Sequence, residues 1–170
     1  GATVVIIGRN QQALDEAVQT LGEKAAALQA DVANVADLDR VFSVIASQYG
    51  KIDVLFLNAG VAPFAPLEAT DEALFDHIIN VNVKGVFFAI QKAAPLLTQG
   101  ASVVINASVA SVVGIPNTSV YSASKAAVRS LARTLSAELV GRGIRVNTVS
   151  PGPIQTPLFG KTGLPQEAAE

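Results

Sequence analysis

The chain has 170 residues, 50% of them hydrophobic and 15% charged, with a formal net charge of −2. This size and apolar content suit one domain with a sizeable core, and the charge excludes the basic surface that nucleic-acid binding requires. The absence of cysteine excludes disulfides and thiolate chemistry, and apolar runs such as Val86–Ile90 are too short to span a bilayer, so we expect a cytoplasmic protein without membrane partners.

Short β-rich runs alternate with helical patterns along the first third of the chain. Apolar side chains repeat at helical spacing after the first and second of these runs, and a glycine ends each helix, at Gly22 and Gly50. Strands are predicted over residues 3–7, 25–30 and 54–57, and the helices over residues 14–21 and 38–49.

The same alternation continues to the end of the chain. A loop over residues 61–68 leads to a long helix reaching about Leu97, with Thr70 as its predicted N-cap because acids follow in the first turn. Residues 102–107 and 144–149 are predicted as strands, residues 119–141 as the helix between them, and the Gly/Pro-rich remainder to Glu170 as a loop.

Five β-to-α alternations predict an α/β fold, a doubly wound parallel sheet in three α/β/α layers, with residues 1–170 as a single domain. Ligands of such sheets bind at the carboxyl ends of the strands. Small or polar residues stand at each predicted strand end: Gly8-Arg9-Asn10, Asp31-Val32, Asn58-Ala59-Gly60, Ser108 and Ser150-Pro151-Gly152.

A tyrosine and a lysine lie four residues apart at the start of the helix that follows the fourth strand. Tyr121 and Lys125 therefore share one helix face. A nearby cation stabilises a phenolate, which suits proton exchange with a carbonyl or an alcohol. Ser108, thirteen residues before Tyr121, would face the same crevice and bind the same oxygen. The alternative is an ordinary helix surface with an exposed lysine.

Five motifs in order resemble those of the short-chain dehydrogenase/reductase family, and in particular its oxoacyl-carrier-protein-reductase-like and sugar or alcohol dehydrogenase branches. The resemblance covers nearly the whole chain and implies a Rossmann-like domain that binds NAD(P). The motifs are Asn58-Ala59-Gly60, Asn82-Val83-Lys84-Gly85, Asn106-Ala107-Ser108, Tyr121-Ser122-Ala123-Ser124-Lys125 and Pro151-Gly152-Pro153-Ile154-Gln155-Thr156.

The resemblance implies four catalytic residues. Tyr121 would be the general acid/base, and Ser108 would orient and polarise the substrate oxygen. Lys125 would stabilise the phenolate and bind the nicotinamide ribose. Asn82 would hold a water that relays protons from Lys125 to solvent; its alternative is a helix-interior asparagine that faces a neighbouring carbonyl.

The resemblance also implies a set of cofactor-binding residues, and no metal ligand. Gly60 would allow the backbone to approach the ribose closely. Asp31 would accept a hydrogen bond from the adenine amino group, with Val32 beside the ring. The full set is Arg9, Asp31, Val32, Asn58, Ala59, Gly60, Tyr121, Lys125, Pro151, Gly152, Ile154 and Thr156, of which the last four would line the nicotinamide pocket.

Cofactor preference depends on the end of the first strand, where an acidic residue would bind the adenosine ribose hydroxyls of NAD. Gly8 stands there, and Arg9 follows it. A guanidinium without the acid suits the 2′-phosphate of NADP, so we expect NADP(H) to be preferred over NAD(H). The alternative is that Arg9 only stacks on the adenine.

One motif of the family is missing. Its first strand ends in a glycine-rich turn, TGxxxGxG, that holds the pyrophosphate, and no part of this sequence matches it. That strand is central, between those corresponding to residues 4–7 and 54–57, so its absence leaves unpaired ladder groups. The C-terminal lid and last strand are likewise not found after Glu170. We therefore expect an internal portion of a longer enzyme or an incompletely represented chain.

These features predict an NADP-dependent oxidoreductase that interconverts a ketone and a secondary alcohol, with a small-molecule carbonyl or alcohol as substrate. The alternative is a non-catalytic dinucleotide-binding or interaction domain of the same fold. The helices over residues 71–97 and 119–141 resemble those that build the family's subunit interfaces, so we expect a homodimer or homotetramer.

Overall fold

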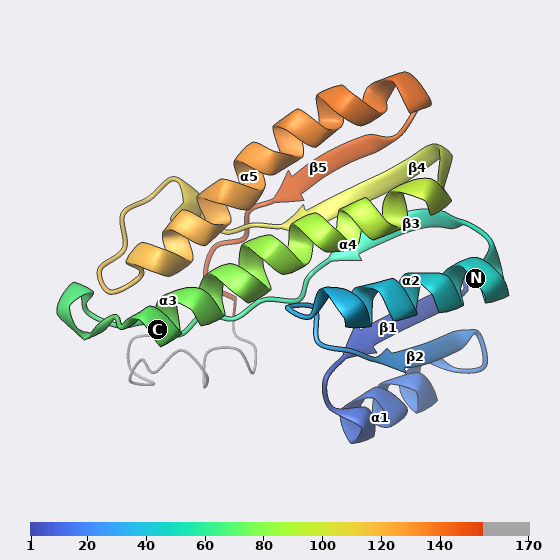
Figure 1. Ribbon diagram of the computed structural model, residues 1–170, viewed down its shortest axis with the longest axis horizontal. Helices are drawn as coiled ribbons and strands as arrows, with labels where there is room; N and C mark the ends of the chain where they lie inside the picture. The colour runs from blue at the N-terminus through green and yellow to red at the C-terminus, as the bar shows by residue number, and fades with distance from the viewer. Residues whose placement is uncertain (155–170) are drawn as a thin grey trace.

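The computed structural model describes residues 1–154 and confirms the α/β fold class (Figure 1). Each predicted strand and helix is present, with bounds that differ by a few residues. The strands are β1 (Val4–Gly8), β2 (Ala25–Gln29), β3 (Ile52–Leu57), β4 (Leu97–Asn106) and β5 (Arg145–Val149); the helices are α1 (Gln11–Leu21), α2 (Val35–Tyr49), α3 (Glu72–Ile79), α4 (Gly85–Ala93) and α5 (Ser119–Leu139).

All strand pairs are parallel, but the five strands form two hydrogen-bonded sets. β1 pairs with β2, and β4 pairs with β3 on one side and β5 on the other. β1 and β3 lie next to each other in the order of the layer, yet they share no ladder within residues 1–154 (Figure 1). The division falls where the family resemblance places the strand with the glycine-rich turn.

Helices join the two sets from one face. Apolar side chains of α2, including Val41 and Phe42, pack in one cluster with residues of β1 and β3. A second cluster joins α4 and α5 to the middle of β4, where Val103 and Ile105 are fully buried. On the opposite face, α1 packs against β1 and β2, and Phe56 of β3 is exposed.

Turn residues end the first two helices as predicted. Gly22 and Gly50 are the C-caps of α1 and α2, and both have positive φ. The predicted N-cap of the long helix is wrong by one residue: Asp71 accepts a hydrogen bond from the amide of Leu74 (2.8 Å), whereas Thr70 donates its hydroxyl to the carbonyl of Pro66 (3.0 Å).

The long helix predicted after Thr70 is continuous but irregular. A π-helical turn, η2 (Asn80–Lys84), joins α3 to α4, and a 3-10 turn, η3 (Ala94–Leu96), follows. By length and composition alone, Glu72–Leu96 is apolar enough to cross a membrane. Because its buried residues pack in the two clusters between the helices and strands, we interpret it as the core helix of the fold.

The start of α4 is pressed against the loop that follows β2. A Cβ on Gly85 would lie 2.8 Å from the carbonyl oxygen of Val32, closer than a side chain tolerates. The glycine of the Asn82-Val83-Lys84-Gly85 motif therefore has a packing reason. This contact also ties the loop with Asp31 and Val32 to the π-turn that contains Asn82.

Candidate active site

The predicted catalytic side chains gather at the carboxyl end of the β3–β5 set. Ser108 follows β4 and is the N-cap of a 3-10 turn, η4 (Val109–Ser111), which packs against α5. The Ser108 hydroxyl oxygen accepts a hydrogen bond from the amide of Ala110 (3.2 Å), which leaves its proton free to donate. Tyr121 lies in the first turn of α5 and is half-buried.

Lys125 is buried beneath Tyr121, so the alternative of an exposed lysine is wrong. Its side chain is 7% exposed, and the ammonium lies 5.8 Å from the centroid of the Tyr121 ring. The Nζ atom donates a hydrogen bond to the backbone carbonyl of Asn106 at the end of β4 (2.8 Å). Burial lowers the pKa of Lys125 from 10.5 to about 8, because desolvation disfavours the ammonium.

Asn82 is one of the most buried polar residues, at 1% exposure. Its Oδ1 accepts the amide of Val61, and its Nδ2 donates to the Val61 carbonyl and to the Ser124 hydroxyl (2.9, 2.9 and 3.0 Å). The alternative of a helix-interior asparagine facing a neighbouring carbonyl therefore describes its side-chain contacts. The water-relay role stays a prediction. A π-turn is often found at functional sites, and Asn82 lies within one.

Gly60 leaves a space beside the catalytic side chains. A Cβ built on this residue would lie 3.3 Å from Asn82 Oδ1 and 3.5 Å from Lys125 Nζ. The exposed Asn58-Ala59-Gly60 segment thus passes the buried ammonium with only a hydrogen where other residues carry a side chain. The predicted approach of this backbone to a cofactor ribose stays a prediction.

Hydrogen bonds hold the ends of three strands in register at this point. The Asn106 side chain donates to Asn58 Oδ1 across the ends of β4 and β3 (2.7 Å). The amide of Ala107 bonds the carbonyl of Val149, and the amide of Val109 bonds that of Pro151 (2.8 and 2.9 Å). Pro151 therefore lies alongside the segment with Ser108, while Gly152 and Ile154 are exposed. Thr156 lies outside the described residues.

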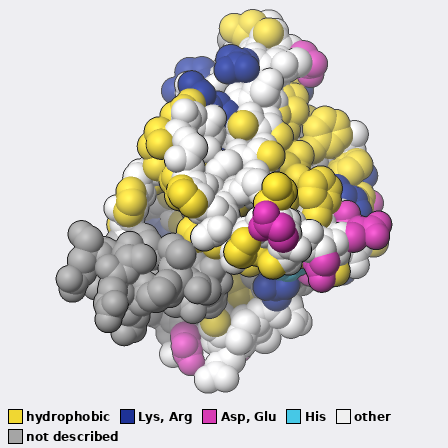
Figure 2. Space-filling view, turned by 90° about the vertical axis from the view of Figure 1, so that its left-hand side faces the viewer, with side chains coloured by type: hydrophobic (Ala, Val, Ile, Leu, Met, Phe, Trp, Pro, Cys, Tyr) yellow, Lys and Arg dark blue, Asp and Glu magenta, His cyan; other side chains and the backbone are white. Residues whose placement is uncertain are grey.

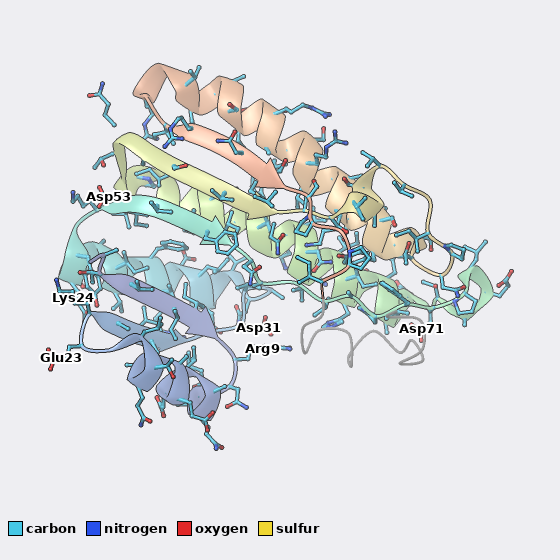
Figure 3. All side chains as sticks on the ribbon, turned by 180° about the vertical axis from the view of Figure 1, so that it is seen from behind. Arg9, Glu23, Lys24, Asp31, Asp53 and Asp71 are labelled. Atoms are coloured by element: carbon cyan, nitrogen blue, oxygen red, sulfur yellow. The ribbon has the colours of Figure 1, made fainter. Side chains whose placement is uncertain are left out.

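Arg9 and Asp31 lie side by side where β1 and β2 end (Figure 3). The Arg9 carbonyl accepts the side-chain amide of Gln29 (2.8 Å), and the Arg9 side chain is exposed. One Asp31 carboxylate oxygen accepts the amide of Ala33 (2.9 Å). The backbone amide of Asp31 bonds Asp37, and this hydrogen bond, with a smaller contribution from Arg40, lowers the pKa of Asp37.

Three residues at the site were not assigned a role from the sequence. Asn106 offers its carbonyl to Lys125, Ser124 donates to the Tyr121 carbonyl (2.6 Å) besides accepting from Asn82, and Phe64 packs against the Tyr121 ring. Asn106 and Ser124 stand inside recognised motifs, one at a strand end and one on the Tyr121 helix, and that placement was the available signal. Phe64 lies in none of these motifs, and it reaches Tyr121 only because of the conformation of its loop.

Comparison with known proteins gives consistent results. A family model described as enoyl-(acyl carrier protein) reductase matches residues 1–170. The chain is 39% identical over 175 residues to the 3-oxoacyl-(acyl-carrier-protein) reductase FabG of Thermotoga maritima, covering 100% of this chain and 70% of that protein.

Solved structures resemble the fold closely. The crystal structure of 3-ketoacyl-(acyl-carrier-protein) reductase from Brucella melitensis complexed with NADH matches with a TM-score of 0.90 and 30% identity, over 96% of this chain and 70% of that one. A short chain dehydrogenase from Burkholderia cenocepacia in complex with NADP matches with a TM-score of 0.85 and 34% identity, over 93% and 66%.

We predict that replacing Lys125 by methionine stabilises the fold at neutral pH. A pKa lowered on folding means that the unfolded chain binds the proton more tightly, so the parent gains stability as pH rises from about 8 to 10.5. Below pH 8 the parent must keep a buried ammonium, which lowers its free energy of unfolding by at most about 3 kcal/mol, and the variant has no such charge. The hydrogen bond to Asn106 that the variant loses reduces this gain.

Urea unfolding of parent and variant at pH 7 and pH 10.5 measures the difference, which should be present at pH 7 and lost at pH 10.5. Lys24→Met, on an exposed lysine, is the matched control and should change little at either pH. A Lys125→Met variant that is less stable than the parent at pH 7 would contradict the argument.

Proposed function

The chain belongs to the short-chain dehydrogenase/reductase family and is an oxidoreductase acting on CH–OH and C=O groups, and we propose that it interconverts a ketone and a secondary alcohol with NADP(H) as cofactor. The observation that carries the proposal is the buried Lys125 ammonium, 5.8 Å from the centre of the Tyr121 ring. Burying a cation beside a phenol costs folding free energy, and a phenolate formed during proton transfer would offset that cost.

The residues at the strand ends fit a nicotinamide dinucleotide. Gly60 supports this fit, since a Cβ there would fill the space next to Lys125 Nζ. Asp31 keeps one carboxylate oxygen without a protein partner among the described residues. In this proposal Lys125 and Asn58-Ala59-Gly60 hold the nicotinamide ribose, Asp31 and Val32 hold the adenine, and Pro151, Gly152, Ile154 and Thr156 hold the carboxamide.

The chain's own residues handle the proton in this proposal, while a bound nicotinamide supplies or accepts the hydride. Tyr121 donates its phenolic proton to the carbonyl oxygen during reduction and takes it back during oxidation. Ser108 donates a hydrogen bond to the same oxygen, since its own oxygen already accepts the Ala110 amide. Lys125 stabilises the phenolate that proton transfer leaves. Asn82 relays protons from Lys125 to solvent through a water.

We expect Tyr121→Phe to lower kcat/KM for ketone reduction by roughly 10²- to 10⁴-fold, the usual contribution of a positioned acid/base. NADPH binding, measured by its fluorescence, should change by less than about threefold, since the ring and its contact with Phe64 remain. The other tyrosine offers the matched control: Tyr49→Phe, in α2, should leave turnover unchanged.

Unchanged turnover in Tyr121→Phe would remove the acid/base assignment. NADPH binding by the parent without turnover of any ketone would favour the non-catalytic dinucleotide-binding alternative. We propose the enzyme over that alternative because the buried Lys125 lies near the Tyr121 ring and bonds the carbonyl of Asn106, at the end of the strand that Ser108 follows.

The preference for NADP rests on Arg9. Its exposed side chain follows the end of β1, where Gly8 stands in place of an acid. A guanidinium binds a phosphate with charge-assisted hydrogen bonds, and a carboxylate at this point would repel it.

Arg9→Ala should therefore raise the KM for NADPH about tenfold or more, because the variant loses a hydrogen bond to a charged group. The KM for NADH should stay nearly unchanged. Steady-state kinetics with both cofactors measures this difference. Arg145→Ala, an exposed arginine at the start of β5, is the control. An equal loss with both cofactors would support stacking of Arg9 on the adenine instead.

We also propose a homodimer or homotetramer. An open, largely apolar groove lies between α5 and the helix formed by η2 and α4. Its lining includes Val83, Phe87, Phe88 and Leu131, together with Lys84. Phe87 is exposed despite its size. An exposed apolar surface of this kind on two helices suits burial against a second copy.

Phe87→Asp should lower the molar mass measured by light scattering from that of a dimer or tetramer to a smaller species, because a charge in an apolar interface is costly. The control is Phe75→Asp, a comparably exposed phenylalanine on α3 outside the groove, which should keep the parent mass. A parent protein that is monomeric would contradict the proposal.

A further inference from the structure

Phe64 touches the predicted acid/base directly. The centroids of the Phe64 and Tyr121 rings are 5.7 Å apart, with the rings tilted by 54°. Phe64 comes from the loop between β3 and the 3-10 turn η1 (Leu67–Ala69), and it is half-buried. A ligand bound beside the Tyr121 phenol would lie near Phe64, so the chemistry of Phe64 bears on the substrate.

The loop that carries Phe64 is held firmly on both sides. Val61 is bound through its amide and its carbonyl by the buried Asn82 side chain (2.9 Å each). The amide of Ala65 donates to the carbonyl of Asn117, in the loop before α5 (2.9 Å). Phe64 lies between these two anchors. Its place next to Tyr121 is therefore built by hydrogen bonds and is not a chance contact of an exposed chain.

The loop bonded to it through Asn117 presents apolar side chains to solvent. Val112 is 63% exposed, Val113 and Ile115 are also exposed, and Leu67, the first residue of η1, is 75% exposed. Figure 2 looks onto this end of the molecule and shows hydrophobic side chains exposed on it, with acidic side chains beside some of them. Apolar groups left open beside a reactive side chain are typical of a surface that receives an apolar ligand.

Charged side chains are missing from residues 54–67 and 93–124, and Glu68 follows the first of these segments directly. Among the described residues, Lys125 is a cation near these loops, but it is 7% exposed and donates to the carbonyl of Asn106. A substrate carboxylate bound between these loops would lose its water without gaining a countercharge from them, whereas a hydrocarbon group would gain from burial.

We propose that the substrate carries an uncharged, apolar group on the carbon chain next to its reacting C=O or CH–OH, and that Phe64 is a residue that selects it. This inference rests on the proposed ketone/alcohol chemistry and narrows its substrate class. Phe64 provides apolar surface at the phenol, and the two uncharged loops extend that surface away from it.

The test compares two ligands of equal carbon number, 2-octanone and 2-oxooctanoate, with the full-length protein. Binding is measured by calorimetry in the presence of NADP⁺, where no reduction can occur, and kcat/KM is measured separately with NADPH. We expect 2-octanone to be favoured about tenfold or more in both measurements. Along a series of 2-alkanones, each added methylene should raise kcat/KM by about two- to fourfold until the loops are filled.

Variants of Phe64 separate selection from folding. Phe64→Arg should lower the 2-octanone to 2-oxooctanoate ratio at least about tenfold, because it places a countercharge where the carboxylate would bind. Phe64→Leu should keep the ratio near that of the parent. Phe75→Leu, on an exposed phenylalanine of α3, is the control and should change neither ligand.

The outcomes distinguish the two levels of the proposal. A parent that prefers 2-oxooctanoate, or a Phe64→Arg variant that changes both ligands equally while its thermal unfolding stays normal, would overturn the assignment of Phe64 and of the apolar substrate. Binding of 2-octanone with the expected preference but no turnover with NADPH would support this recognition and count instead against the proposed reaction.

Discussion

The hydrogen bond from Lys125 to the carbonyl of Asn106 is the constraint around which the site is arranged. An ammonium taken out of water must find a partner, and this one finds a backbone carbonyl at the end of β4 instead of a carboxylate. The carbonyl can accept this bond only if β4 ends there and the second turn of α5 presents Lys125 to it. The end of β4 and α5 are therefore joined directly by a buried charge.

The buried Asn82 side chain fixes the position of the loop after β3. Because its amide uses both donor hydrogens, on Val61 and Ser124, it ties that loop to α5 from within the π-turn of the core helix. The next residues of the helix reach Gly85, which is pressed against Val32. A chain of direct contacts thus runs from the loop at the end of β2 to Tyr121, so the two ends of the proposed cofactor site are held by one helix.

The fold was predictable because periodicity and glycine ends depend on local sequence. The alternation of strands and helices, the helix ends at Gly22 and Gly50, and the placing of Tyr121 and Lys125 in one helix followed from it. The π-turn and the Asn82 contacts did not, since they arise from packing between segments more than 20 residues apart. Phe64 was missed for the same reason: nothing in a short apolar loop reveals which ring it will meet.

The lack of charged side chains in residues 54–67 and 93–124 has an electrostatic consequence. A carboxylate near Lys125 would lower the cost of burying the ammonium, but it would also neutralise the cation that a phenolate on Tyr121 needs. No acid lies within residues 54–67 or 93–124, and the carbonyl of Asn106 provides a dipole without a net charge. The positive charge therefore stays available to Tyr121, while the buried ammonium of Lys125 lowers the stability of the fold. The same uncharged loops provide apolar surface next to the phenol, so the condition that favours proton transfer and the condition that favours an apolar substrate come from one property of the sequence.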